Sequence, residues 1–238
     1  MIFKKLLSDP DEVTKKVLDS IELKEALLLT YFNQHCFNVY YEDKAYRNLI
    51  EQKFNAYQAD LGIYLALKLL LKNDISKIVG TDLNISILNE LIAKKIALVI
   101  VGGKFEESFV MKEAKKSGIN LLYYKNGFFD ESEVESIVTQ LNSFNANVIF
   151  VGMGVPKQEL FAEKLSRALK NKVIICVGMF FEYYFGTTKR APVFIQKIGL
   201  EWMFRLLTEP KRLWRRYLIG IPEFIFRVIK MKLGSKVT

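Results

Sequence analysis

The sequence lacks a run of apolar residues long enough to cross a membrane, and it has few residues of the kinds that bind metals or form cross-links. Spanning a bilayer takes about 20 consecutive apolar residues, whereas the longest apolar runs, 96–103 and 148–154, have the length of strands. One histidine, His35, and two cysteines, Cys36 and Cys176, occur among 238 residues. This scarcity argues against a Cys/His metal site, and we predict that the protein holds no metal. Two distant cysteines are typical of a protein in a reducing compartment. We interpret each of them as a small buried hydrophobic residue.

The N-terminus, MIFKKLLSDPDEV, does not have the pattern of a secretory signal. Its apolar stretch is too short, and acidic residues follow at once. We therefore expect a cytoplasmic protein.

The positive charge of the chain is concentrated at its C-terminal end. Residues 1–188 carry 23 Lys and Arg against 23 Asp and Glu, so the net charge of +9 comes from residues 189–238. There, basic residues alternate with large apolar ones, including Trp202 and Trp214. Such a mixture is typical of helices that lie in a membrane interface. We predict a globular domain over 1–188 and a helical appendage over 189–238 that associates with an anionic membrane surface.

The pattern of the first part predicts an α/β fold, a Rossmann-like parallel sheet flanked by helices. Strands are predicted at 96–103, 147–154 and 172–179, with weaker ones at 25–30 and 120–124. Helix-like stretches at 106–116, 132–144 and 158–169 separate the strong strands, as in right-handed crossovers of a parallel sheet. Two further helices are predicted at 43–54 and 61–72, and the second is apolar nearly all round, so we expect it to be buried.

Glycines follow the predicted strands, at the edge where parallel sheets bind ligands. Helices that start there direct positive dipole ends toward the same edge, which suits a phosphate or diphosphate. Tight turns explain any single one of these glycines equally well. The glycines are Gly102, Gly103, Gly127, Gly152, Gly154 and Gly178.

The segment VGMGVPKQE, 151–159, is more specific. Pro156 suits the first turn of a helix, and Lys157 at the helix start can neutralise a phosphate. Gln158 and Glu159 can hydrogen-bond to ribose or sugar hydroxyls. A solvated helix start is the alternative interpretation.

Asp60 is the candidate general base. It directly precedes the apolar helix, where an aspartate is most often an N-cap, but a partly buried carboxylate can also deprotonate an acceptor hydroxyl. Asn33 and His35 follow a predicted strand and can face the same cleft.

Arginines in the C-terminal part recur on one helix side and are suited to phosphates, because the guanidinium group binds them in bidentate fashion. They could hold lipid phosphates or a substrate diphosphate. They are Arg205, Arg212, Arg215 and Arg216.

Taken together, these motifs resemble the WecG/TagA/CpsF family, glycosyltransferase family 26. The matching segments are ADLGIYLA, KIVGTDL, LVIVGG, NGFF, VIFVGMGVPKQE, VGMFFEYYFGTTKRAP and GLEWMFRLLTEPKRLWRR, in the order of the family. The resemblance implies inverting transfer of a hexose-type sugar (ManNAc, ManNAc uronic acid, glucose or similar) from a UDP-sugar to a polyprenyl-diphosphate-linked sugar. It places the protein peripherally on the inner face of the bacterial cytoplasmic membrane, in the synthesis of cell-surface polysaccharides. It also implies a switch between a soluble homo-oligomer and a membrane-bound monomer, and no cofactor besides the sugar donor.

The resemblance also assigns residues. It makes Asp60 the catalytic base and gives the arginines of the appendage the task of closing the active site. Four positions depart from the family pattern: Leu61 replaces a glycine, Tyr31 a threonine, Lys77 an arginine and Glu182 an aspartate. The implied substrate-binding residues are Asn33, Lys77, Asp82, Phe128, Gln158, Glu159, Arg190, Arg205, Arg212 and Arg215.

Two alternatives belong to other classes of protein. A non-catalytic module that binds nucleotide-sugars or lipid phosphates would bind UDP without transferring a sugar. A nucleic-acid binder would stack bases on the aromatic residues of the appendage, but the neutral body supplies no basic groove. We therefore expect no nucleic-acid partner.

Overall fold

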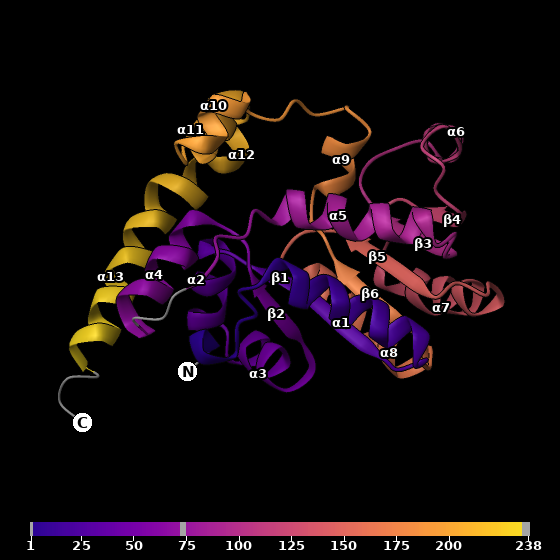
Figure 1. Cartoon of the computed structure of the whole chain (residues 1–238), viewed down its shortest axis with the longest axis horizontal. Coiled ribbons are helices and arrows are strands. Elements are labelled where there is room, and N and C mark those ends of the chain that lie inside the picture. The colour runs from indigo at the N-terminus through magenta and orange to yellow at the C-terminus, as the bar shows by residue number, and fades with distance from the viewer. Residues whose placement is uncertain (1, 72–74, 235–238) are drawn as a thin grey trace.

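The computed structural model describes residues 2–71 and 75–234 and contains a six-stranded, all-parallel sheet (Figure 1). The strands are β1 (Leu27–Phe32), β2 (Asn55–Gln58), β3 (Leu98–Gly102), β4 (Leu121–Lys125), β5 (Val148–Gly152) and β6 (Val173–Cys176). Their order is β2-β1-β6-β5-β3-β4. The predicted α/β fold is confirmed, together with all five predicted strands.

Strand β2, which lies at the edge of the sheet beside β1, was not predicted. Its sequence, NAYQ, has polar residues at both ends and only four positions, so it lacks the apolar run of a buried strand. It pairs with β1 in register Tyr31↔Tyr57, and this pairing brings Asp60 to the same edge as Asn33.

Alternate residues of the strands face two helical layers, as the pleat requires. On β3, Leu98 and Ile100 face a core cluster built with α1 (Pro10–Glu22), α5 (Gly80–Ala93) and α6 (Glu107–Lys116). Val99 and Val101 face the opposite cluster, built with α7 (Val134–Ser143) and α8 (Lys157–Ala168). The sheet is thus buried on both faces, which explains the uniformly apolar sequences of its central strands β3, β5 and β6.

A third core cluster lies at the β2 end of the sheet. It joins the 3-10 helix η1 (Ile2–Lys5), α2 (Gln34–Glu42), α3 (Lys44–Lys53) and α4 (Leu61–Leu71). Phe224 and Val228 of the C-terminal helix α13 (Gly220–Gly234) complete this cluster. The last helix of the chain is therefore anchored in the core by one of its faces.

The predicted burial of the helix at 61–72 is wrong. Ile63, Ala66 and Leu67 of α4 are buried, but Leu65 is 55% exposed and Leu69 is 39% exposed. The helix packs by one face only, so its second apolar face is left open. Lys72, the last residue of the predicted helix, lies outside the described residues.

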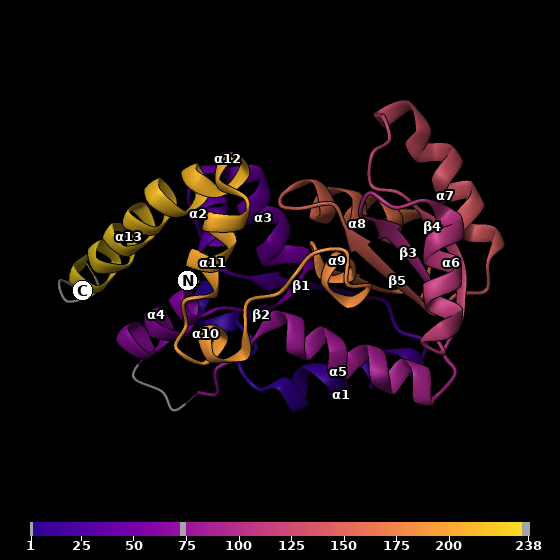
Figure 2. The same cartoon turned by 90° about the horizontal axis from the view of Figure 1, so that it is seen from above.

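The C-terminal arm, residues 189–234, gathers at one end of the molecule beside α2 and α4, away from α6 and α7 (Figures 1 and 2). Between the short helix α9 (Phe180–Tyr184) and α13 it contains α10 (Val193–Lys197), α11 (Glu201–Thr208), α12 (Pro210–Trp214) and a π-helical turn, η3 (Arg215–Ile219). None of the helices in 2–71 and 75–234 is both long and apolar enough to span a bilayer. The boundary near 188 stays a prediction, and residues 235–238 of the predicted appendage lie outside the described residues.

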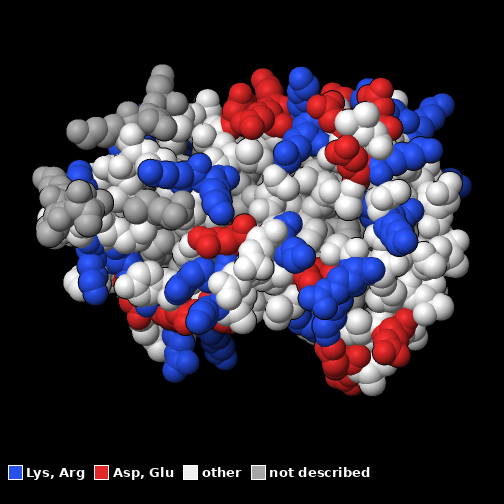
Figure 3. Space-filling model, turned by 90° about the horizontal axis from the view of Figure 1, so that it is seen from below, with Lys and Arg blue, Asp and Glu red and all other residues white. Residues whose placement is uncertain are grey.

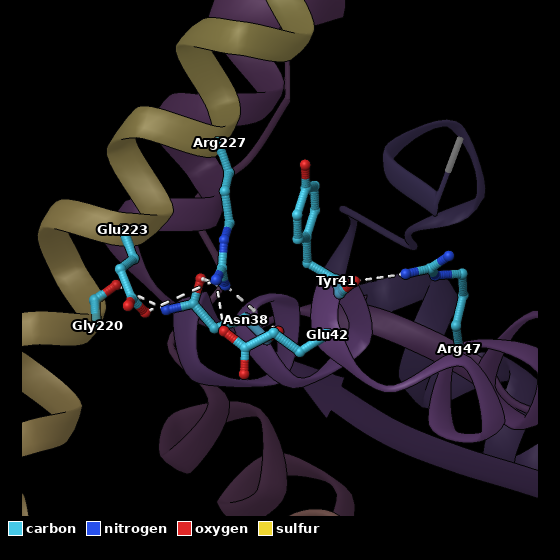
Figure 4. A network of polar contacts seen from close by, with 7 residues as sticks. All are labelled: Asn38, Tyr41, Glu42, Arg47, Gly220, Glu223 and Arg227. Atoms are coloured by element: carbon cyan, nitrogen blue, oxygen red, sulfur yellow. Dashed lines mark hydrogen bonds and ion pairs between the residues drawn. The ribbon is translucent and has the colours of Figure 1, made fainter.

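A polar network fixes α13 to α2 (Figure 4). Asn38 donates to the carbonyl oxygen of Gly220 at 2.7 Å and accepts from Arg227 at 2.9 Å. Arg227 also forms ion pairs with Glu42 and Glu223, and its guanidinium lies 4.7 Å from the ring centroid of Tyr41. Elsewhere on the surface the two signs of charge are mixed. On the face drawn in Figure 3, Lys and Arg are interspersed with Asp and Glu.

Candidate functional site

A cavity of about 1130 Å³ lies at the carboxyl ends of β1, β2 and β6, with the C-terminal arm forming its other wall. Three residues that follow these strands line it, namely Asn33, Asp60 and Gly178. This is the edge of a parallel sheet where ligands bind. The cavity extends from these polar groups along α4 and α13.

Asp60 is held in this cavity by backbone donors. Its Oδ1 accepts from the N–H of Ile63 at 2.8 Å, and its Oδ2 accepts from the N–H of Gln34 at 3.0 Å. The carboxylate thus caps the first turn of α4 and also lines the cavity, so both interpretations of this residue hold at once. Burial raises the pKa of Asp60 above its ordinary value, while the backbone donors and the positive charge of Arg216 act in the opposite direction. A raised pKa makes the carboxylate a stronger base.

Asn33 and His35 lie beside Asp60 at the start of α2. The Oδ1 atom of Asn33 caps this helix by accepting from the N–H groups of His35 and Cys36, each at 3.0 Å. Burial, followed by the charge of Arg216, lowers the pKa of His35 to about 4. His35 is therefore neutral near pH 7.

Arg216 is the cation whose charge acts on this end of the cavity. It lines the cavity and lowers the pKa of Asp60, His35 and Tyr31. Its buried Nε atom has no hydrogen-bond partner among the described residues. An unpaired guanidinium nitrogen beside a carboxylate is suited to an anionic substrate group. The family-based assignment named Arg215 and did not include Arg216. The paired arginines are visible in the sequence, but the π-helical turn that directs Arg216 inward is not.

The three predicted arginines of the arm also line the cavity. Arg205 lies 5.7 Å from the ring centroid of Tyr183, and its buried Nε atom has no hydrogen-bond partner in the described part of the chain. Arg212 is paired with Glu209 at 2.6 Å, and its Nη2 atom lies 3.1 Å from the sulfur of Met179. Arg215 is exposed and lies over the ring of Trp214, 5.3 Å from its centroid.

Lys77, Asp82 and Arg190 separate into two groups. Lys77 lines the cavity. Asp82 instead accepts from Arg190 at 2.6 Å, and Arg190 also lies 3.6 Å from Glu201 of α11. This ion-pair cluster ties α5 to the arm, and of its three members only Glu201 lines the cavity.

Most of the predicted glycines pack against each other instead of lining the cavity. A methyl group at Gly102 would lie 2.4 Å from the carbonyl oxygen of Gly152, and one at Gly127 would lie 3.2 Å from Gly102. Gly103 donates its N–H to the same oxygen of Gly152 at 3.1 Å. These strand ends are glycine because the backbones touch. Gly154 and Gly178 do line the cavity.

Lys157 and its neighbours serve a different part of the surface. Helix α8 begins at Lys157, one residue before the predicted start, and Pro156 is its N-cap instead of a residue of its first turn. The Nζ atom of Lys157 donates to the carbonyl oxygen of Gly127 at 3.2 Å and lies 5.1 Å from the ring centroid of Phe129. Pro156 and Lys157 line a separate hollow of about 440 Å³, and Phe128 is 71% exposed.

Gln158 and Glu159 are fully buried below the cavity floor. Glu159 accepts from the hydroxyl of Thr30 and from the amide of Gln158, both at 2.8 Å. Gln158 in turn accepts from the N–H of Gly178 at 3.0 Å. Contact of either residue with a sugar stays a prediction, while the structure shows that they hold the turn after β6.

Two of the departures from the family pattern, Tyr31 and Leu61, fill space at the cavity. Tyr31 lines it, and its hydroxyl lies 2.8 Å from the position of a methyl group on Gly178. Leu61 packs against Gly199, where a methyl group would lie 2.6 Å from the leucine side chain. Gly199 lies between α10 and α11 with φ +78°, so Leu61 connects the Asp60 helix directly to the arm.

The chain is similar to known proteins over nearly its whole length. The model of the family described as "Glycosyl transferase WecG/TagA/CpsF family" matches residues 5–238, which includes the arm. An N-acetylglucosaminyldiphosphoundecaprenol N-acetyl-beta-D-mannosaminyltransferase of Bacillus spizizenii is 31% identical over 178 residues, covering 74% of this chain and 68% of the relative. The predicted enzyme class is confirmed, and the non-catalytic alternative is not supported. The chain belongs to the WecG/TagA/CpsF family and is a glycosyltransferase.

Proposed function

We propose that this enzyme transfers N-acetylmannosamine from UDP-N-acetylmannosamine to the GlcNAc of GlcNAc-diphosphoundecaprenol. The similarity to the Bacillus spizizenii enzyme, whose name states this sugar and this acceptor, supports the choice of substrates. The observation that carries the proposal is the cavity in which Asp60 and the cations of the arm face each other. A sugar acceptor needs the base, and a diphosphate needs the cations.

In the proposed reaction, Asp60 takes the proton of an acceptor hydroxyl while that oxygen attacks the anomeric carbon of the donor. The bond between the anomeric carbon and the phosphate oxygen breaks, and UDP leaves with the electron pair. Attack opposite to the leaving group inverts the anomeric centre. Arg205 and Arg216 have unpaired buried Nε atoms at this cavity and would stabilise the negative charge that develops on UDP.

We further propose that the arm meets the inner face of the cytoplasmic membrane. Its charge and its exposed apolar side chains support this location, among them Phe194, Leu207 and Trp214. The acceptor is a lipid, so contact with the membrane surface would bring it to the cavity.

The test is transfer by Asp60→Asn with UDP-N-acetylmannosamine and a short-chain prenyl-diphosphate-GlcNAc, followed by mass spectrometry. Asparagine keeps the size of the side chain and can still accept from one of the two backbone N–H groups, but it cannot accept the proton. We expect turnover to fall about 10³-fold, with UDP affinity unchanged by calorimetry. Wild-type turnover by the variant would refute the role of Asp60, and failure of the wild-type enzyme with this pair would refute the substrates.

A further inference from the structure

We propose that the groove between α4 and α13 binds the first isoprene units of the acceptor lipid. The inference rests on the proposed function, which supplies a prenyl chain attached to the reacting sugar. The groove is the apolar part of the same cavity that contains Asp60. Its apolar walls are Leu65 and Leu69 of α4 and Ile225 and Ile229 of α13.

These four side chains are open although their helices are anchored. Leu65 and Leu69 are four residues apart and share one face of α4, and Ile225 and Ile229 do the same on α13. Their exposed fractions are 55%, 39%, 49% and 48%. A neighbouring face of each helix is buried in the core cluster at the β2 end. An open apolar lining on two anchored helices is the arrangement of a binding groove.

The two helices start close together at the reactive end. A methyl group at Gly62, in the first turn of α4, would lie 3.4 Å from the ring of Phe224 in the first turns of α13. Asp60 precedes α4, and Arg216 lies in the turn that precedes α13. Figures 1 and 2 show the two helices side by side at the end of the molecule. From Asp60 to Leu69 the helical rise is about 13 Å. The groove therefore extends away from the base over a distance that matches several carbon–carbon bonds of a prenyl chain.

The order of groups along the cavity matches the order of groups in the acceptor. The acceptor presents a sugar hydroxyl, then a diphosphate, then an apolar chain. In the cavity, Asp60 lies at the start of α4 and Arg215 lies in η3, directly before α13, and the apolar groove follows along these two helices. Glu223 also lines the cavity, where it is paired with Arg227 at 3.8 Å. This match assigns the groove to the acceptor and not to the donor, which has no apolar chain.

The experiment measures transfer in solution, without membranes or detergent micelles, with GlcNAc diphosphates that carry one, two or three isoprene units. We expect KM to fall about tenfold for each added unit, because the groove removes apolar carbon from water. In the double variant Leu65→Ser/Ile229→Ser, we expect this dependence to shrink to about twofold for each unit. The KM for the sugar donor should remain unchanged in the same variant.

The matched control is Phe226→Ser/Leu233→Ser. These α13 residues are 67% and 61% exposed but do not line the cavity. We expect the control to keep the full chain-length dependence, although it can weaken binding to anionic vesicles. Equal KM values for all chain lengths in the wild-type enzyme, or equal effects of the two double variants, would overturn the groove assignment. Absence of transfer to every acceptor would instead refute the proposed function.

Discussion

The two halves of the sheet's carboxyl edge differ in how closely their strand ends pack. On the β3–β5 side, Gly102, Gly127 and Gly152 bring the strand ends into backbone contact and leave no space for a ligand between them. On the β2–β1–β6 side, the strands end in Asp60, Asn33 and Gly178, and helices instead of neighbouring strand ends form the opposite wall. Glycine at a strand end therefore marks close packing in one half and a cavity floor in the other. The groups proposed to take part in the reaction lie in the half that the arm covers.

The largest effect on stability should come from Gly102→Ala. The new methyl group would lie 2.4 Å from the carbonyl oxygen of Gly152, at a φ of +149°. We expect the free energy of unfolding to fall by about 4 kcal/mol, measured by urea titration. The matched change is Gly154→Ala, which meets nothing within 4 Å at a φ of +78° and should cost about 1 kcal/mol. Equal losses would show that the two halves of the edge do not differ in packing.

Arg216→Gln tests the covered half. This variant removes the charge that acts on Asp60, and we expect kcat/KM to fall about 100-fold without a change in the thermal midpoint. Because Arg216 lowers the pKa of Asp60, its removal raises that pKa. The base then stays protonated to a higher pH, so the acid limb of the pH–rate profile should shift to higher pH.

Two other ionisable groups that line the cavity, His35 and Tyr31, do not produce such a shift near neutral pH. His35 is neutral above about pH 4, and burial raises the pKa of Tyr31 well above its ordinary value. The control is Lys211→Gln, which removes the same charge from an exposed position outside the cavity. A shift of the acid limb in this control as well would indicate a general effect of net charge.

A smaller effect is expected for Glu159→Gln, beneath the boundary between the two halves. Burial raises the pKa of Glu159 from 4.5 to about 7, against the hydrogen bonds from Gln158 and Thr30. As the pH rises past 4.5, the unfolded chain ionises at this position while the folded protein retains the proton, so stability falls until about pH 7. We expect a loss of about 2 kcal/mol between about pH 5 and about pH 7 in the wild type. The glutamine variant should show a flatter profile in urea titrations at several pH values, and an unchanged slope would contradict this origin.

The sequence predicts the sheet well because its central strands are buried on both faces. Runs such as IALVIVGG are then apolar throughout and easily recognised. Strand β2 is not recognised in this way because its sequence, NAYQ, is partly polar. The burial of α4 is predicted wrongly because an apolar helix need not be covered on all sides. Both failures concern contacts with distant parts of the chain.

The candidate site is predicted only in part for the same reason. Asn33 is found because it follows a predicted strand, and Asp60 is found because it precedes the predicted apolar helix. The place of the cavity along the edge depends on the spatial strand order, β2-β1-β6-β5-β3-β4, which differs from the chain order. Arg216 depends on a π-helical turn, and the sequence offers no signal for its register.

The contact between Leu61 and Gly199 has a consequence for turnover. The residue next to the base touches the same segment that carries the cations and one wall of the groove. Displacement of that segment as one body would remove leaving-group stabilisation, acceptor binding and support of the base together. With the arm displaced, the protein would therefore neither activate the acceptor nor stabilise the departing UDP.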